Sequence, residues 1–137
     1  MKKILALLCI FFISLSAFGQ TLYIFGGKDH DEYLGKFNAS PYDSESIWNK
    51  YGEYGSKYQT NSIWNKYGTY GGRYSQYSPF NSYASYPPVL VDKDGKFYGY
   101  FSANSYKTRS YAKTIAFICK HWEDILENPS EWYDDLF

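Results

Sequence analysis

Cysteine is scarce in this sequence. Its 137 residues include two, Cys9 in an apolar N-terminal stretch and Cys119 near the C-terminus. The N-terminal stretch is interpreted below as a cleaved signal, and its removal leaves a single cysteine. Because one cysteine cannot form an internal disulfide, cross-links are excluded as a source of stability. Packing must stabilise the fold instead.

An excess of charge is missing as well. Lys and Arg number 14, Asp and Glu number 14, and the formal net charge is zero. Without Lys2 and Lys3, 12 basic residues remain against 14 acidic ones, a net charge near −2. A chain of this charge has no positive electrostatic field that would attract nucleic acid or anionic lipid. We therefore expect no nucleic-acid partner.

The common catalytic motifs are also absent from the sequence. It contains no G-x-S-x-G nucleophile turn, no H-E-x-x-H zinc helix and no phosphate-binding loop. We therefore expect no metal, no cofactor and no catalytic residue, and a binding or structural protein is favoured over an enzyme.

The first 19 residues have the pattern of a secretory signal peptide. Lys2-Lys3 precedes an apolar run from Ile4 to Leu15, and Ala17-Phe18-Gly19 places small residues at the cleavage positions. A membrane anchor is the competing interpretation, but the run is shorter than the ~20 apolar residues that a span needs. We expect cleavage before Gln20, a single secreted or periplasmic domain over residues 20–137, and no membrane span after cleavage.

Aromatic residues are abundant. Tyr, Trp and Phe make up 23% of the chain, with 17 Tyr and 4 Trp. Many of them fall in a 16-residue repeat that occupies residues 42–88 in three copies. The matching segments are Ser46-Ile47-Trp48-Asn49-Lys50-Tyr51-Gly52, Ser62-Ile63-Trp64-Asn65-Lys66-Tyr67-Gly68 and, more loosely, Ser78-Pro79-Phe80-Asn81-Ser82-Tyr83-Ala84.

Inside the repeats, neither helical nor strand periodicity is present. Each copy alternates large apolar residues with the turn formers Ser, Asn and Gly. The glycines, which accept positive φ, are Gly52, Gly55, Gly68 and Gly71. We predict pairs of tight turns that stack, with Ile47, Trp48, Ile63 and Trp64 in a packed core. Disorder is the alternative for such a composition, and the fixed phase of Ile and Trp argues against it.

Two β-hairpins flank the repeats. Their strands are predicted at residues 22–25, 33–37, 89–91 and 97–101. The two second strands resemble each other, and each contains a glycine, Gly35 or Gly99, which is typical of a bulge or of a close passage of another backbone. Because isolated hairpins are marginal in water, we expect both to pair in one antiparallel sheet.

Helical periodicity begins at Thr108. The apolar stripe comprises Tyr111, Ile115, Ile118, Trp122 and Ile125. Thr108 or Ser110 is expected to cap the start and Asn128-Pro129 to end it, which gives a helix over 108–128, with a short further turn docked within 130–137. The predicted class is α+β: a small antiparallel sheet from two related hairpins, a turn-rich aromatic repeat segment and one C-terminal amphipathic helix.

Two sequence features carry a resemblance over Tyr33 to Tyr106. One is Tyr33-Leu34-Gly35-Lys36-Phe37-Asn38-Ala39-Ser40-Pro41-Tyr42-Asp43-Ser44, and the other is the Asn-x-Tyr-Gly-x-Tyr-Gly-Ser-x-Tyr pattern of the copies. In both, the chain resembles a family of uncharacterised secreted bacterial proteins, which often have Asn-Pro-Tyr-Gly where Asn49-Lys50-Tyr51-Gly52 stands here. The missing proline leaves the turn less pre-set. The resemblance implies secretion and a shared fold, and assigns no activity or functional residue.

The densest cluster of titratable groups is Asp29-His30-Asp31-Glu32. A histidine between carboxylates can act as a general base or bind a metal, which would make the chain a small secreted hydrolase. The interpretation that we favour is a solvated hairpin tip.

Three other candidates favour structural roles. We interpret His121 as a boundary residue beside the helix stripe. Asp92-Lys93-Asp94-Gly95 indicates a plain turn, because the later ligands of a calcium loop are missing. Cys119 flanks the buried stripe and is expected to be an inert core thiol.

The repeat tyrosines are the candidate binding residues. Exposed rings in a row can stack on sugars or hold a cation. The residues proposed from sequence are Tyr51, Tyr54, Tyr67, Tyr70 and Tyr86. We therefore expect a secreted, non-enzymatic binding or structural module for cell-surface polysaccharide or a protein partner. The alternative is a hydrolase that uses Asp29, His30 and Asp31.

Overall fold

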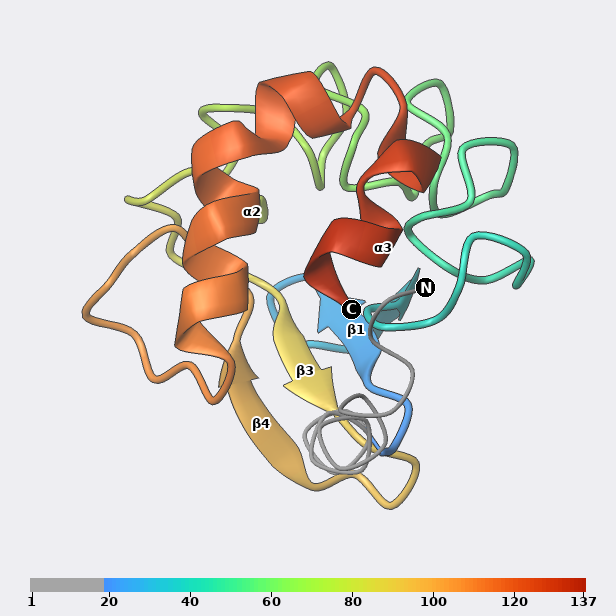
Figure 1. Cartoon of the computed structure of the whole chain (residues 1–137). Coiled ribbons are helices and arrows are strands. Elements are labelled where there is room, and N and C mark those ends of the chain that lie inside the picture. Colours follow the sequence, from blue (N-terminus) through green and yellow to red (C-terminus); the bar gives the residue numbers. More distant parts are fainter. Residues whose placement is uncertain (1–18) are drawn as a thin grey trace.

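The computed structural model describes residues 19–137, and the predicted signal peptide lies outside them except for Gly19. The described residues form one four-stranded antiparallel sheet, a long run of turns and one main helix near the C-terminus (Figure 1). The predicted α+β class is confirmed. Within this part of the chain, no helix combines the length and apolarity that crossing a membrane requires.

The sheet combines two hairpins. Its strands are β1 (Tyr23–Gly26), β2 (Glu32–Lys36), β3 (Val89–Val91) and β4 (Phe97–Tyr100), in the order β2-β1-β3-β4. The first strands of the two hairpins pair with each other, and Ile24 lies opposite Leu90. The predicted side-by-side arrangement is therefore confirmed, and the repeat segment connects β2 to β3.

Gly35 and Gly99 occupy equivalent places in the second strands. Their φ angles are +102° and +99°. A Cβ atom would lie 2.7 Å from the Glu45 carbonyl oxygen at Gly35 and 2.7 Å from the Thr108 carbonyl oxygen at Gly99. The pairing of both hairpins shifts at these places. The prediction of a close passage of another backbone is thus confirmed at both glycines.

The turn of the second hairpin is organised by Asp92. Its Oδ1 accepts hydrogen bonds from the backbone N–H groups of Asp94 and Lys96, both at 2.9 Å. These bonds lower the pKa of the Asp92 carboxyl, since they favour the ionised form. Gly95 completes the turn at φ +84°. The predicted plain turn is present.

The main helix, α2 (Ala112–Ile125), begins later than the sequence predicts. Tyr111 is its N-cap residue, and neither Thr108 nor Ser110 caps it. The reason is that residues 108–110 run beside β4: the Tyr100 N–H donates to the Thr108 carbonyl at 2.7 Å and the Ser110 N–H to the Tyr98 carbonyl at 3.1 Å. The predicted apolar stripe is buried at Ile115, Ile118, Trp122 and Ile125.

The C-terminal residues dock on the first repeat copy. They form η1 (Pro129–Glu131) and α3 (Tyr133–Leu136). The Ser130 hydroxyl donates to the Trp48 carbonyl at 2.9 Å. Trp132, Leu136 and Phe137 pack against the core, as predicted.

Within the repeats, serine and asparagine side chains fix successive turns, which Figure 1 shows in cyan to green beside the helices. The buried hydroxyls of Ser46, Ser62 and Ser78 accept the N–H two residues later, at 2.9, 3.1 and 3.0 Å. Asn49, Asn65 and Asn81 do the same through Oδ1, at 3.0, 3.1 and 3.0 Å. These local bonds replace the ladder of a helix or sheet, which explains the lack of either periodicity.

The role predicted for the repeat glycines is wrong. The described glycines with positive φ are Gly27, Gly35, Gly95 and Gly99. The repeat glycines instead allow backbone segments to approach. A Cβ atom at Gly55 would lie 1.9 Å from the Asn49 carbonyl oxygen, and one at Gly71 would lie 2.4 Å from the Asn65 carbonyl oxygen.

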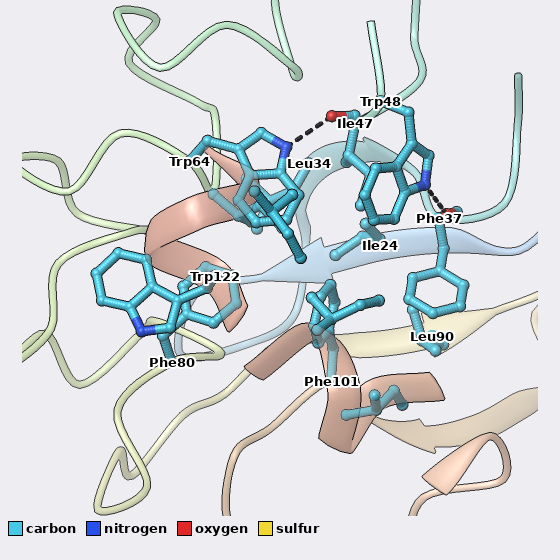
Figure 2. Packing of buried hydrophobic residues seen from close by; sticks show 14 of the residues in the cluster. Ile24, Leu34, Phe37, Ile47, Trp48, Trp64, Phe80, Leu90, Phe101 and Trp122 are labelled. Carbon is cyan, nitrogen blue, oxygen red and sulfur yellow. Dashed lines mark hydrogen bonds between the residues drawn. The ribbon is translucent and has the colours of Figure 1, made fainter. Parts of the chain in front are cut away.

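Tryptophans link each copy to the chain before it. The Trp48 indole Nε1 donates to the Phe37 carbonyl at 2.7 Å, and the Trp64 Nε1 donates to the Ile47 carbonyl at 2.6 Å (Figure 2). Ile47, Trp48, Ile63 and Trp64 are all fully buried, so their prediction as core is confirmed. Both of these buried indole N–H groups have an acceptor, as a stable core requires.

The third copy ends this series. The side chain of Phe80 has no N–H to donate, and its ring lies between two indoles instead. The centroid of Phe80 is 5.5 Å from that of Trp64 and 4.8 Å from that of Trp122 in α2. Trp48 in turn lies 5.6 Å from Trp64. We call Trp48, Trp64, Phe80 and Trp122 the aromatic column.

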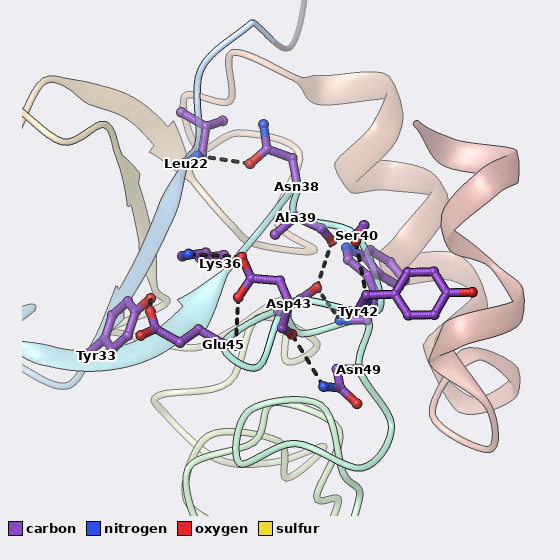
Figure 3. A network of polar contacts seen from close by, with 12 residues as sticks. Leu22, Tyr33, Lys36, Asn38, Ala39, Ser40, Tyr42, Asp43, Glu45 and Asn49 are labelled. Atoms are coloured by element: carbon purple, nitrogen blue, oxygen red, sulfur yellow. Dashed lines mark hydrogen bonds and ion pairs between the residues drawn. The ribbon is translucent and has the colours of Figure 1, made fainter.

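A polar network stabilises the turn that leads from β2 into the first copy of the repeat (Figure 3). Asp43 accepts from the Glu45 backbone N–H and pairs with the Lys36 ammonium, each at 2.9 Å. The Glu45 N–H and the Lys36 ammonium lower the pKa of the Asp43 carboxyl. The Tyr33 hydroxyl donates to Glu45 at 2.6 Å. Burial is the main cause that raises the pKa of Tyr33, and this hydrogen bond raises it further.

Candidate functional site

Seven tyrosines project from the turns with more than four fifths of their surface exposed. They are Tyr42, Tyr51, Tyr58, Tyr67, Tyr74, Tyr83 and Tyr106. Six of them recur at intervals of nine and seven residues through the repeats. Their backbones are held by the turns: Asn49 accepts the Tyr51 N–H at 3.0 Å, and Ser56 accepts the Tyr58 N–H at 3.2 Å. The sequence thus fixes the direction of these rings locally.

A basic residue directly precedes four of the exposed tyrosines. These pairs are Lys50-Tyr51, Lys57-Tyr58, Lys66-Tyr67 and Arg73-Tyr74. In the first three, the lysine Nζ lies over its neighbour's ring, at 5.2, 5.5 and 5.6 Å from the centroid. This arrangement is a cation–π contact, in which the ring face attracts the ammonium. The Arg73 guanidinium lies 5.9 Å from the ring centroid of Trp122.

Three adjoining pockets lie between these pairs. The first, of about 480 Å³, is bordered by Tyr51 and Tyr58, the second, of about 360 Å³, by Tyr58 and Tyr67, and the third, of about 490 Å³, by Tyr67 and Tyr74. Neighbouring pockets share a lysine-tyrosine pair. We call the three together the tyrosine groove.

The other wall of the tyrosine groove comes from the C-terminal elements. Pro129 lines the first pocket, Leu126 the first two, and Trp122 the third. Apolar surface therefore faces the tyrosine rings across each pocket. Such surroundings are typical of sites that bind a ligand with apolar faces and a few polar contacts.

Two ion pairs cross the groove. Lys57 pairs with Glu127 and Arg73 pairs with Glu123, both at 2.5 Å. The hydrogen bond to Lys57 lowers the pKa of the Glu127 carboxyl, and the same bond raises the pKa of Lys57. Both partners are therefore held in their charged forms near neutral pH.

The structure divides the five tyrosines proposed from sequence into two groups. Tyr51 and Tyr67 are exposed and border the groove. Tyr54 and Tyr70 are half-buried against the core, and burial raises the pKa of both hydroxyls. Tyr86 is half-buried and stacks on Tyr77 with centroids 5.7 Å apart.

Sequence reasoning missed the remaining groove residues. Tyr58 and Tyr74 begin the second and third copies, and their exposure was not anticipated. The basic residue before each exposed tyrosine of the groove was also overlooked. The sequence signal for these contacts is three dipeptides, Lys50-Tyr51, Lys57-Tyr58 and Lys66-Tyr67. Adjacent side chains of a fixed turn can place an ammonium group over a ring.

The His30 ring contacts a backbone carbonyl group. Its Nε2 is 3.0 Å from the Pro87 carbonyl oxygen, and His30 adopts a positive φ of 54° in the hairpin turn. Asp29 and Asp31 are exposed and open onto a different pocket of about 340 Å³, lined by Tyr70 and Tyr77. In residues 19–137, no group of three or more His, Cys, Asp or Glu side chains is placed to hold a metal ion.

His121 packs against two other rings, which also contact each other. Its centroid lies 4.4 Å from that of Phe117 and 6.1 Å from that of Trp132. It is half-buried beside the helix stripe, as the sequence predicts for a boundary residue.

Cys119 should be an unreactive thiol. Its Sγ lies 3.7 Å from the Pro79 carbonyl oxygen, and burial raises its pKa to about 12. At pH 8 we expect the folded protein to react with an aromatic disulfide reagent at least about 100-fold more slowly than the denatured chain, because the thiolate is scarce. Absorbance of the released thiol measures both rates. Equal rates would contradict the burial of this side chain.

Comparison with known proteins gives no assignment. No protein-family model matches the chain, and no curated protein or solved structure is similar to it. The resemblance to uncharacterised secreted bacterial proteins stays a prediction.

Proposed function

We propose that this protein is an exported, non-enzymatic binding module that holds a cell-surface polysaccharide in the tyrosine groove. The observation that carries the proposal is the row of exposed rings at Tyr51, Tyr58, Tyr67 and Tyr74, which border three adjoining pockets. Exposed aromatic surface gathered on one face indicates a binding site. Sugar rings have apolar C–H faces that stack on such side chains.

The carboxylates at the groove favour binding over hydrolysis. A glycoside hydrolase needs one carboxylic acid with a raised pKa to protonate the leaving oxygen. Here the pKa of Glu127 is lowered by Lys57, and Glu123 is paired with Arg73. Glu127 is therefore suited to hold its cation in place rather than to transfer a proton.

Repeated sites on one face also support a polymeric ligand. The first and third pockets are bordered by equivalent pairs of the repeat, since Tyr51 and Tyr58 correspond to Tyr67 and Tyr74. A chain of sugars can occupy several such pockets at once, and each contact then raises the effective concentration for the next.

A panel of immobilised polysaccharides tests the proposal. We expect the protein without its predicted signal peptide, residues 20–137, to bind at least one polysaccharide. The Tyr51→Ala/Tyr67→Ala variant should bind it at least about tenfold more weakly, which corresponds to about 1.4 kcal/mol of binding free energy. Biolayer interferometry measures both affinities. Circular dichroism should show the same fold, since exposed side chains contribute little to stability.

The matched control is Tyr42→Ala/Tyr106→Ala. Both side chains are 97% exposed, and neither lines a pocket of the groove. We expect this variant to bind like the unmodified protein. Binding to no polysaccharide, or equal losses in the two double variants, would contradict the proposed site.

A further inference from the structure

The charges along the tyrosine groove follow a regular pattern. The first pocket is lined by Lys50, Lys57 and Glu127, and the second by Lys57, Lys66 and Glu127. The third is lined by Lys66, Arg73 and Glu123. Each pocket therefore has two cationic side chains and one carboxylate, a net charge of +1.

This positive charge is local. The four cations and two carboxylates give the groove a net charge of +2, whereas the described chain carries 12 basic and 14 acidic residues. The remainder of the described chain thus has a net charge near −4. A surface of one sign inside a molecule of the other sign attracts a ligand at that surface and repels it elsewhere.

Two of the four cations, Lys50 and Lys66, form none of the ion pairs seen among the described residues, although Lys66 adds a weaker electrostatic interaction with Glu127. The ion pairs of the described residues involve Lys36, Lys57 and Arg73. Lys50 and Lys66 instead place their ammonium groups 5.2 and 5.6 Å from the ring centroids of Tyr51 and Tyr67. A sugar stacked beside either ring would have an ammonium within reach of its substituents.

We propose that the ligand of the tyrosine groove is an acidic polysaccharide, whose carboxylate or sulfate groups pair with Lys50 and Lys66. This inference rests on the proposed function and names its ligand class. The tyrosine rings contact the apolar sugar faces, and the lysines contact the acidic groups between them. Charge-assisted hydrogen bonds of this kind are stronger than neutral ones and fix the position of the anion.

The charge distribution favours this polymer over nucleic acid. A nucleic-acid strand carries a phosphate at every nucleotide, and proteins that bind it use a broad basic surface. Here a strand that extended beyond the pockets would meet a surface with a net charge near −4. An acidic polysaccharide in which only some substituents are charged fits a pocket of net charge +1 better.

Matched probes separate the charge from the sugar backbone. Polygalacturonate and its fully methyl-esterified form differ in the free carboxylate, and dextran sulfate and dextran differ in the sulfate. We expect one charged member to bind at least about tenfold more tightly than its neutral counterpart. Binding should weaken when salt rises from about 0.05 M to about 0.5 M, because exposed charges are screened. The two pairs distinguish carboxylate from sulfate recognition.

Variants assign the effect to the two lysines. We expect Lys50→Gln/Lys66→Gln to bind the charged probe about tenfold more weakly, and to lose clearly less affinity for the neutral probe. The control Lys93→Gln/Lys113→Gln removes the same charge from two exposed lysines that line none of the three pockets, and should bind normally. Circular dichroism and a melting curve check that both variants fold.

The outcomes separate this inference from the proposed function. Equal binding of charged and neutral probes, or equal losses in the two lysine variants, would overturn the acidic-ligand inference and leave polysaccharide binding in place. No binding to any polysaccharide would overturn both. Binding of a thymidine oligonucleotide without polysaccharide binding would also overturn both, in favour of a nucleic-acid ligand.

Discussion

The Trp64→Ala variant is expected to lose about 4 kcal/mol of unfolding free energy. Trp64 is fully buried, stacks on Phe80 and contacts Trp48, so alanine would leave a cavity at the centre of the aromatic column. It would also remove the hydrogen bond to the Ile47 carbonyl, and a buried carbonyl without a donor is costly. Few single substitutions in a domain of this size have a larger effect.

Urea unfolding followed by far-UV circular dichroism measures this loss. Trp64→Phe should lose roughly half as much, because it keeps a ring in the column and removes the N–H donor. Tyr67→Ala, three residues away and exposed, should change the free energy of unfolding by less than about 0.5 kcal/mol. If Trp64→Ala unfolds within about 1 kcal/mol of the unmodified protein, the aromatic column is not the core of the fold.

Gly55→Ala should destabilise the protein by about 3 kcal/mol or prevent folding. The added methyl group would lie 1.9 Å from the Asn49 carbonyl oxygen and 2.6 Å from its carbonyl carbon, so the backbone itself must move. Overpacking against a backbone that is fixed by turn hydrogen bonds strains the whole copy. Thermal unfolding monitored by circular dichroism gives the change in stability.

Two further glycines test the cause. Gly71→Ala places a methyl group 2.4 Å from the Asn65 carbonyl oxygen in the second copy, and it should behave like Gly55→Ala. Gly95→Ala meets nothing within 4 Å and has only its φ of +84° to strain it, so its cost should be about 1 kcal/mol. Similar losses at Gly55 and Gly95 would show that close approach is not what requires glycine in the repeats.

The hairpins, the buried tryptophans and the helix stripe were predictable because each depends on a local pattern. Alternation and Asp94-Gly95 indicate a hairpin, and a glycine within a strand indicates a close backbone. The fixed phase of Ile47, Trp48 and their equivalents indicates a layer that packs. In these places the local preference and the tertiary structure agree.

The start of α2 was not predictable, because it depends on tertiary pairing. Residues 108–110 directly precede the apolar stripe and include the capping candidates Thr108 and Ser110, yet their backbone hydrogen bonds go to β4. Because Arg109 pairs with Gly99 of β4, residues 108–110 stay extended and the helix begins only at Ala112. Propensity at a helix end is too weak to oppose such pairing.

The binding residues were only partly predictable, for a similar reason. Tyr51 and Tyr54 are three residues apart in the same copy, and composition gives no ground for distinguishing them. The turn at Asn49 exposes Tyr51, whereas Tyr54 packs against Tyr33 at 5.1 Å between ring centroids. Only the position of β2 decides which ring is covered.

The aromatic column and α2 share a period. Successive rings at Trp48, Trp64 and Phe80 are 5.6 and 5.5 Å apart, and one turn of an α-helix rises about 5.4 Å. Lys57 and Arg73, one copy apart, accordingly pair with Glu127, just beyond the end of α2, and with Glu123 within α2, which are four residues apart. A chain with one more copy would therefore need one more helical turn to keep every pair matched, so insertions in the two segments must occur together.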